Sequence, residues 1–220
     1  MVERNGKRTP RAQRTATRKT QMIHFTVITD TKETEFNYFN GLWRSLPLDI
    51  SNRLSIHLIK NTQTAKLIDE AIKIRSTNSN YSETWIVLDR DEVKNFDQIV
   101  DDAGKYGIQV GWSNPCIEIW FHAYLGKMPF SNNSVECCKE FKRIFEQKVG
   151  KRYRKSDTHI YETLSRVGNE SDAILFASRR YEQHRNEGKC KPSEMIPCTT
   201  LHIIIQSIHR SCQNKKPTIQ

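Results

Sequence analysis

Hydrophobic and polar positions in the first half of the chain switch repeatedly between strand and helix periodicity. Short β-branched or apolar runs predict four strands, at 22–29, 53–59, 84–88 and 108–112. Apolar positions at helical spacing predict a helix after each strand, at 33–46, 64–76, 97–106 and 116–125. Pro115 is expected at the start of the fourth helix. This alternation is typical of an α/β fold with a mainly parallel sheet flanked by helices.

The second half of the chain has a different pattern, because strand signals cease after Pro129. Helical spacing predicts four further helices, at 135–149, 159–167, 172–185 and 199–210. The predicted organisation is a basic tail at 1–20, an α/β core at 21–126, a helical portion packed on that core at 127–212, and a C-terminal tail at 213–220.

Positive charge is concentrated at the N-terminus. The chain carries 35 Lys and Arg against 25 Asp and Glu, a net charge of +10, and residues 1–20 hold seven basic groups against one acid. The first 20 residues have no large aliphatic residue after Val2, so we expect them to be disordered. A basic arm of this kind binds polyanions through their phosphates, although a solubilising tail has the same composition. Under the first interpretation the candidate phosphate contacts are Arg8, Arg11, Arg14, Arg18 and Lys19.

Several classes of protein are excluded by what the sequence lacks. No apolar run approaches the ~18 residues of a membrane span, and no apolar stretch follows the basic N-terminus as in a secretory signal, so we expect a cytoplasmic protein without membrane association. The absence of a Gly-rich phosphate loop argues against a P-loop ATPase or a dinucleotide enzyme. The six cysteines form no C-x-x-C pair, and their spacing matches no standard zinc site, so we expect buried or idle thiols.

Acidic side chains follow three of the predicted strands. Asp30 follows the first, Asp89 and Asp91 follow the third, and Glu118 lies just beyond the fourth. The carboxyl ends of parallel strands meet at one edge of a sheet, where ligands bind, so we expect these four acids to converge. Converging carboxylates with room for water suit Mg²⁺, or Mn²⁺. The alternative is that these acids cap helices or lie solvated on the surface.

Five runs of the sequence together resemble the RloB-like family, whose members have a Toprim-like fold and occur beside bacterial restriction and antiphage loci. They cover roughly residues 22–210 in order. The runs are ITDTKETEFNYF (28–39), WIVLDRDEV (85–93), NPCIEIWFHAYL (114–125), KRYRKSDTHIYETL (151–164) and PCTTLHIII (197–205).

The resemblance implies a Mg²⁺-dependent nuclease in antiphage defence. Toprim-like domains place a Glu after the first strand and an Asp-x-Asp after a later one. Asp89 and Asp91 take the Asp-x-Asp place, and Glu118 matches the Asn-Pro-x-x-Glu-x-Trp run. Asp30 departs from the usual Glu, and because it is one methylene shorter, an acid/base role needs a closer approach or a bridging water. Glu33 and Glu35 are the nearby replacements, although Glu35 has its own place in the shared run.

The resemblance also implies binding partners. Basic residues that would hold a nucleic-acid backbone, beside a stacking ring at Tyr153, are Lys151, Arg152, Arg154 and Lys155. The alternative is that this basic cluster is a solvated loop. His202 matches a family histidine for which either a structural or a phosphate-contacting role is open. A partner protein of the defence system is a further expectation.

Two other functions compete with the nuclease. One is a nucleic-acid-binding or partner-binding effector with a degenerate active site, which the Asp30 departure favours. The other is a haloacid-dehalogenase-like phosphohydrolase, because DRDEV copies its nucleophile loop. The loop here arrives only after two strand–helix units, which argues against this second alternative.

Overall fold

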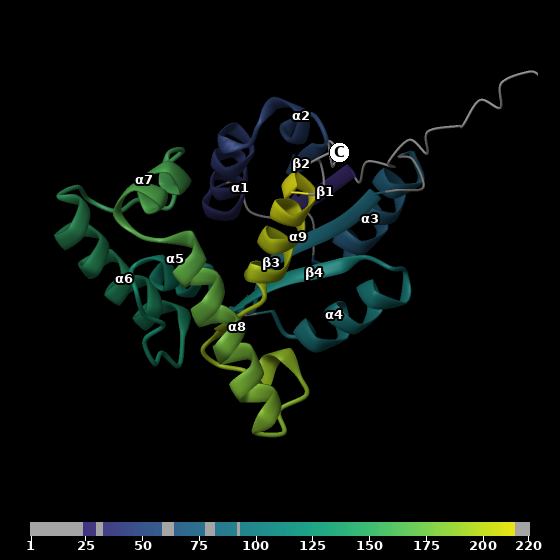
Figure 1. Ribbon diagram of the computed structural model, residues 1–220. Helices are drawn as coiled ribbons and strands as arrows, with labels where there is room; N and C mark the ends of the chain where they lie inside the picture. The colour runs from purple at the N-terminus through teal and green to yellow at the C-terminus, as the bar shows by residue number, and fades with distance from the viewer. Residues whose placement is uncertain (1–23, 30–32, 59–63, 78–81, 92, 214–220) are drawn as a thin grey trace, which may run out of the picture.

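The computed structural model describes residues 24–29, 33–58, 64–77, 82–91 and 93–213 (Figure 1). Within them, a five-stranded sheet is formed by β1 (His24–Thr29), β2 (Leu54–Leu58), β3 (Ser82–Asp89), β4 (Gln109–Asn114) and β5 (Cys198–Thr199). The helices are α1 (Thr34–Ser45), α2 (Leu48–Ser51), α3 (Thr64–Thr77), α4 (Phe96–Lys105), α5 (Glu118–Tyr124), α6 (Ser134–Val149), α7 (Ile160–Val167), α8 (Glu170–Asn186) and α9 (Leu201–Gln213). The short 3₁₀ helix η1 spans Pro192–Glu194. The predicted α/β class with a helical C-terminal half is confirmed.

The strand order is β2-β1-β3-β4-β5. The first four strands run parallel, and β5 pairs antiparallel with β4. The strand that follows β1 in the sequence, β2, lies on one side of β1 in the sheet, and the next strand, β3, lies on the opposite side. The direction in which strands are added therefore reverses between β1 and β3. In open α/β sheets, such a switch point leaves a crevice at the carboxyl ends of the two strands, where ligands bind.

Each face of the sheet is covered by its own hydrophobic core, because successive strand side chains point to opposite faces. Phe25 and Val27 of β1 pack in a core with side chains of α1, α5 and α9, whereas Ile28 packs with α3 and α4 on the other face. Figure 1 shows α3 and α4 together on one side of the strands, with α1 and α9 on the other. Both faces of the parallel strands are therefore buried.

Two segments that the sequence assigned to helices are placed differently by the structure. Pro115 does not begin a helix: α5 starts at Glu118, and the intervening residues form a turn in which the Cys116 carbonyl accepts from the Ile119 N–H at 3.0 Å. Thr199, predicted as helical, lies in β5. A two-residue strand has no periodicity to detect, and its position depends on the Ser113–Thr199 pairing with β4.

None of the helices among the described residues is long and apolar enough to cross a membrane.

Candidate metal centre

Three carboxyl groups converge at the carboxyl end of the central strands. Glu35 lies in the first turn of α1, Asp89 is the last residue of β3, and Glu118 is the first residue of α5. Asp89 forms a side-chain hydrogen bond with Glu35 and is close enough to Glu118 for the two charges to interact. Glu35 is 3% exposed and Glu118 is fully buried. These three residues are called the acidic cluster below.

Backbone hydrogen bonds hold the segment after β3 against the turn before α5. The Arg90 N–H donates to the Ser113 carbonyl at 2.8 Å, and the Asp91 N–H donates to the Pro115 carbonyl at 3.0 Å. The Ile117 N–H donates to the Asp89 carboxylate. The β3 and β4 segments are thus joined beyond the end of the sheet, which brings Asp89 beside Glu118.

Burial raises the pKa of Asp89 well above its usual range, and the neighbouring charges of Glu35 and Glu118 raise it further. The hydrogen bond from Ile117 opposes this rise in pKa but does not cancel it. Without a cation, full negative charge on the cluster is therefore disfavoured. A divalent cation would relieve the same repulsion.

The two carboxylate oxygens of Glu118 have different surroundings. Oε1 accepts a hydrogen bond from the Tyr153 hydroxyl at 3.0 Å, and the Lys155 ammonium lies 3.8 Å from it. Oε2 is buried and has no hydrogen-bond partner. Burial of a carboxylate oxygen without a partner is costly, so this atom suits a cation or a proton. Burial and the charge of Glu118 raise the pKa of Tyr153, which keeps its hydroxyl protonated as a donor.

Oxygen donors from three carboxylates are the ligands that Mg²⁺ prefers. The unpaired Oε2 of Glu118 and the repulsion at Asp89 both fit a bound divalent cation at the acidic cluster. Among the described residues, however, the ligand atoms that lie within 4.8 Å of one another belong to Cys116, Glu118 and Cys138, and not to the three carboxylates of the acidic cluster.

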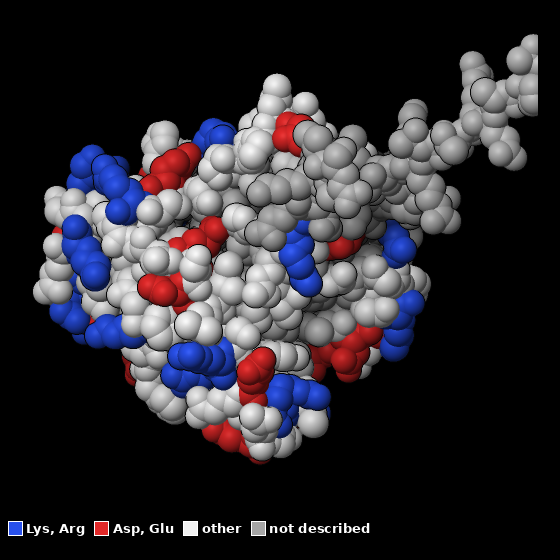
Figure 2. Space-filling view, in the orientation of Figure 1, with Lys and Arg blue, Asp and Glu red and all other residues white. Residues whose placement is uncertain are grey.

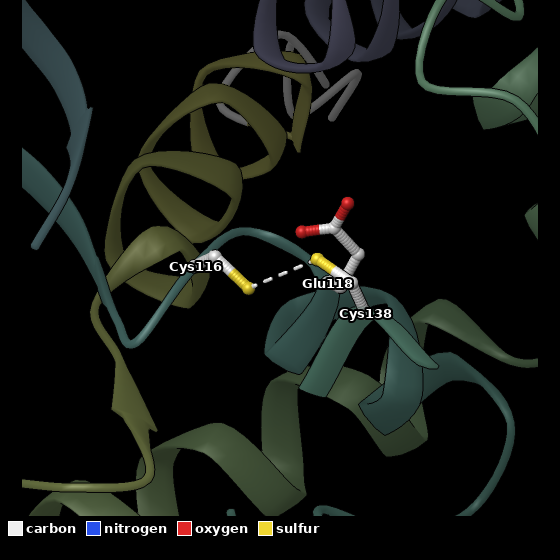
Figure 3. Close-up of side chains that lie close together, drawn as sticks. All are labelled: Cys116, Glu118 and Cys138. Atoms are coloured by element: carbon white, nitrogen blue, oxygen red, sulfur yellow. Dashed lines mark hydrogen bonds between the residues drawn. The ribbon is translucent and has the colours of Figure 1, made fainter. Parts of the chain in front are cut away.

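Two thiols lie close to Glu118. The Cys116 and Cys138 sulfurs are 3.8 Å apart, and each lies within 4.8 Å of a Glu118 carboxylate oxygen (Figure 3). Cys116 comes from the turn between β4 and α5, and Cys138 from the second turn of α6. A hydrogen bond with Cys137 and burial raise the pKa of the Cys116 thiol. The chain thus places a possible metal site at Cys116, Glu118 and Cys138.

Asp91 is held differently from Asp89. Its side chain is exposed and its φ is +23°, in the left-handed region that Asp tolerates better than most residues. The Ser134 hydroxyl, at the first residue of α6, donates to Asp91 Oδ1 at 2.7 Å. The structure therefore brings Asp89 and Glu118 into one cluster, whereas the Asp91 side chain is hydrogen-bonded to Ser134 of α6. Asp30 lies outside the described residues.

The basic segment between α6 and α7 carries the other predicted contacts. Lys151, Arg152, Arg154 and Lys155 are exposed, and a surface hollow is lined by Lys142, Glu146, Gly150, Lys151 and Arg152. Figure 2 shows Lys and Arg side chains gathered along the edge where Figure 1 places α6 and α7. Arg8, Arg11, Arg14, Arg18 and Lys19 lie outside the described residues.

Two candidate nucleic-acid contacts, Tyr153 and His202, have buried side chains in this structure. Tyr153 packs against Phe141 and Phe145 and cannot serve as a stacking ring. His202 is 4% exposed, with Nδ1 3.2 Å from the Thr199 carbonyl. Burial lowers the pKa of His202 to about 4, so it is neutral and has no charge to offer a phosphate. It therefore has the structural role that the sequence left open.

Glu35 is the cluster residue that strand-end reasoning missed, because that reasoning considered only acids directly after strands. Its signal lay in the helix: Glu35, Tyr38, Phe39 and Leu42 share the buried face of α1. An acid on the apolar face of a helix needs a partner or a cation.

The comparison with curated proteins gave no significant match, and neither did the comparison with solved structures. A family model described as RloB-like protein matches residues 25–208, which include all of the sheet except the first residue of β1, and the whole acidic cluster. The chain belongs to the RloB-like protein family.

Proposed function

We propose that this protein is a Mg²⁺- or Mn²⁺-dependent nuclease that hydrolyses phosphodiester bonds of RNA, tRNA or DNA. The observation that carries the proposal is the convergence of Glu35, Asp89 and Glu118 at the switch point of the sheet, with Glu118 Oε2 buried and unpaired. The resemblance to restriction-associated and antiphage proteins supports a role for this activity in bacterial defence.

Glu35, Asp89 and Glu118 would hold the metal at the acidic cluster. When bound there, Mg²⁺ would supply positive charge that polarises a phosphate and lowers the pKa of a water molecule. Asp91, on the same loop as Asp89, faces solvent beside the cluster and would add a ligand through water. Asp30, expected after β1, would serve as base or as a further ligand.

Lys155 would orient the substrate at the same place. Its ammonium lies 3.8 Å from Glu118 Oε1, and about half of its side chain is exposed. Burial is the largest single influence and lowers the pKa of Lys155, but the charges of Glu118, Cys138, Cys116 and Asp89 together raise it overall, so the group stays cationic. Lys151 and Arg152 on the same segment would hold the flanking phosphates.

The test is cleavage of DNA, RNA and tRNA with Mg²⁺, with Mn²⁺ and with EDTA. We expect metal-dependent cleavage of at least one substrate by the wild-type protein. Asp89→Asn and Glu118→Gln should lower the rate at least about 100-fold, since even loss of an outer-shell partner costs metalloenzymes 10–100-fold. Asp101→Asn is the matched control, because Asp101 is an exposed acid on α4; its rate should match the wild type.

A catalytically degenerate nucleic-acid- or partner-binding effector is the second candidate. The observation that favours it is the Lys155–Glu118 ion pair, which supplies the buried carboxylate with a counter-ion from the chain itself. An effector of this kind would bind nucleic acid equally with EDTA and with Mg²⁺ and would cleave none of the three substrates. That result would contradict the nuclease proposal.

A further inference from the structure

The two thiols beside Glu118 are not needed for a site of carboxylate oxygens, and Mg²⁺ has little affinity for sulfur. Cys116 is 2% exposed, and Cys138 is partly exposed. Their sulfurs come from segments 22 residues apart in the sequence, and they lie 3.8 Å from each other. The donor set therefore suggests a ligand of a different chemical class from Mg²⁺.

The geometry of the thiol pair matches that of a zinc dithiolate. Zinc–sulfur bonds are about 2.3 Å long, so two sulfurs on a tetrahedral zinc lie about 3.8 Å apart. The sulfur atoms of Cys116 and Cys138 are 3.8 Å apart in this structure, which is the same distance. The third donor, a Glu118 carboxylate oxygen, lies within 4.8 Å of both sulfurs, so a side-chain adjustment of about 1 Å completes the set.

A second, independent observation points to a ligand here. Glu118 is fully buried, and its Oε2 has no hydrogen-bond partner. Figure 3 shows the carboxylate beside the two sulfurs, with nothing among the labelled side chains bonded to it. The net charge of two thiolates, one carboxylate and a divalent cation is −1. The Lys155 ammonium lies 3.8 Å from Glu118 and balances this charge.

We propose that Cys116, Cys138 and Glu118 form a binding site for one thiophilic divalent cation of the zinc class. Zinc sites that bind an exchangeable water or substrate have three protein ligands and an open fourth position. The proposed site has the same arrangement. The partly exposed Cys138 gives the metal a route in from solvent. The site shares Glu118 with the proposed nuclease centre, but its existence does not require nuclease activity.

The test uses the full-length protein, freed of metal and kept reduced with a phosphine, with Zn²⁺ and Co²⁺ as the probes. We expect one Zn²⁺ per chain with a Kd below about 1 µM. Bound Co²⁺ should give the visible absorption of a tetrahedral complex and a near-ultraviolet sulfur-to-metal band. Cys116→Ser and Cys138→Ser should each reduce the sulfur band, since one of two sulfur ligands is lost, and weaken Zn²⁺ binding at least about 100-fold, and Glu118→Gln should weaken it at least about 10-fold.

The chain offers two matched controls, the exposed Cys190 and the buried Cys198. Cys190→Ser and Cys198→Ser should bind Zn²⁺ as the wild type does. Where a serine variant folds poorly, alkylation of the wild-type protein gives the same answer: Zn²⁺ should protect Cys138 from a maleimide and leave Cys190 reactive. A wild type with no sulfur-to-cobalt band, or Zn²⁺ binding that survives both Cys116→Ser and Cys138→Ser, would overturn the proposal.

Discussion

Asp89 and Glu118 both lie where burial disfavours a charged carboxyl group, but the groups that surround the two carboxyls differ. At Asp89, burial and the charges of Glu35 and Glu118 raise the pKa, so the charged form is less favourable there than in water. Glu118 has the Tyr153 hydroxyl and the Lys155 ammonium at one oxygen and no partner at the other. A cation would suit each arrangement, which supports the proposed metal site over a set of helix caps.

Asp89→Asn tests that interpretation through stability. Removal of one acid relieves repulsion, so we expect the variant in EDTA to unfold at the wild-type temperature or above. Mg²⁺ at 100 times its Kd should stabilise the wild type by about 2.7 kcal/mol, which raises its Tm by roughly 5–10 °C, and should leave Asp89→Asn unchanged. Thermal melts with EDTA and with Mg²⁺ measure both effects.

Asp101→Asn should behave as the wild type in both melts. If Asp89 is instead a structural carboxylate, Asp89→Asn will melt earlier in EDTA and the wild type will not respond to Mg²⁺. The nuclease proposal would then lose its main support.

Sequence periodicity identified most helices and strands within a few residues, because each has an apolar face wide enough to recur. The elements it missed are short: α2, η1 and β5 have four, three and two residues. Their positions depend on tertiary contacts, such as the Ser113–Thr199 pairing that brings β5 onto the sheet. Periodicity also does not reveal contacts between helices that are far apart in the sequence. The contact between α1 and α7 is an example.

Gly41 shows how closely α1 and α7 pack. A Cβ atom built on Gly41 would lie 2.5 Å from Cβ of Tyr161 on α7, whereas one built on Gly104 in α4 would meet nothing within 4 Å. We expect Gly41→Ala to lower the free energy of unfolding by about 1–3 kcal/mol, since the helices must move apart. Gly104→Ala should raise it by up to about 1 kcal/mol, because Ala favours a helix more than Gly does.

Urea denaturation of the two variants measures this difference. The pair is matched, because both glycines lie in helices and both substitutions add one methyl group. Equal changes in the two variants would mean that helix propensity, and not α1–α7 packing, decides the outcome at Gly41.

Across the whole molecule, one sheet separates two hydrophobic cores, and a buried histidine contacts each of them. His122 of α5 packs against Phe141 in the core that contains α1, α5 and α9. His202 of α9 packs against Tyr181, which lies against the opposite core. The sequence placed both on apolar helices, but their burial could be seen only once α6 and α8 were packed against them.

Acid should therefore weaken both cores. Burial lowers the pKa of His122 and of His202 from 6.5 to about 4. The unfolded chain takes up a proton at each site below pH 6.5 and the native chain does not, so stability is full above pH 6.5 and falls between pH 6.5 and about 4. Each histidine accounts for at most about 3 kcal/mol of that loss.

His202→Gln tests this, because glutamine keeps a polar group near the Thr199 carbonyl but does not titrate. We expect the loss of stability between pH 6.5 and 4 to shrink by up to about 3 kcal/mol relative to the wild type, measured from urea midpoints across that range. His159→Gln is the control, because His159 is exposed at the start of α7, and it should retain the wild-type loss. If His202→Gln loses as much stability in acid as the wild type, His202 already takes up its proton in the native state. The acid sensitivity would then have to come from the carboxylates or from His122.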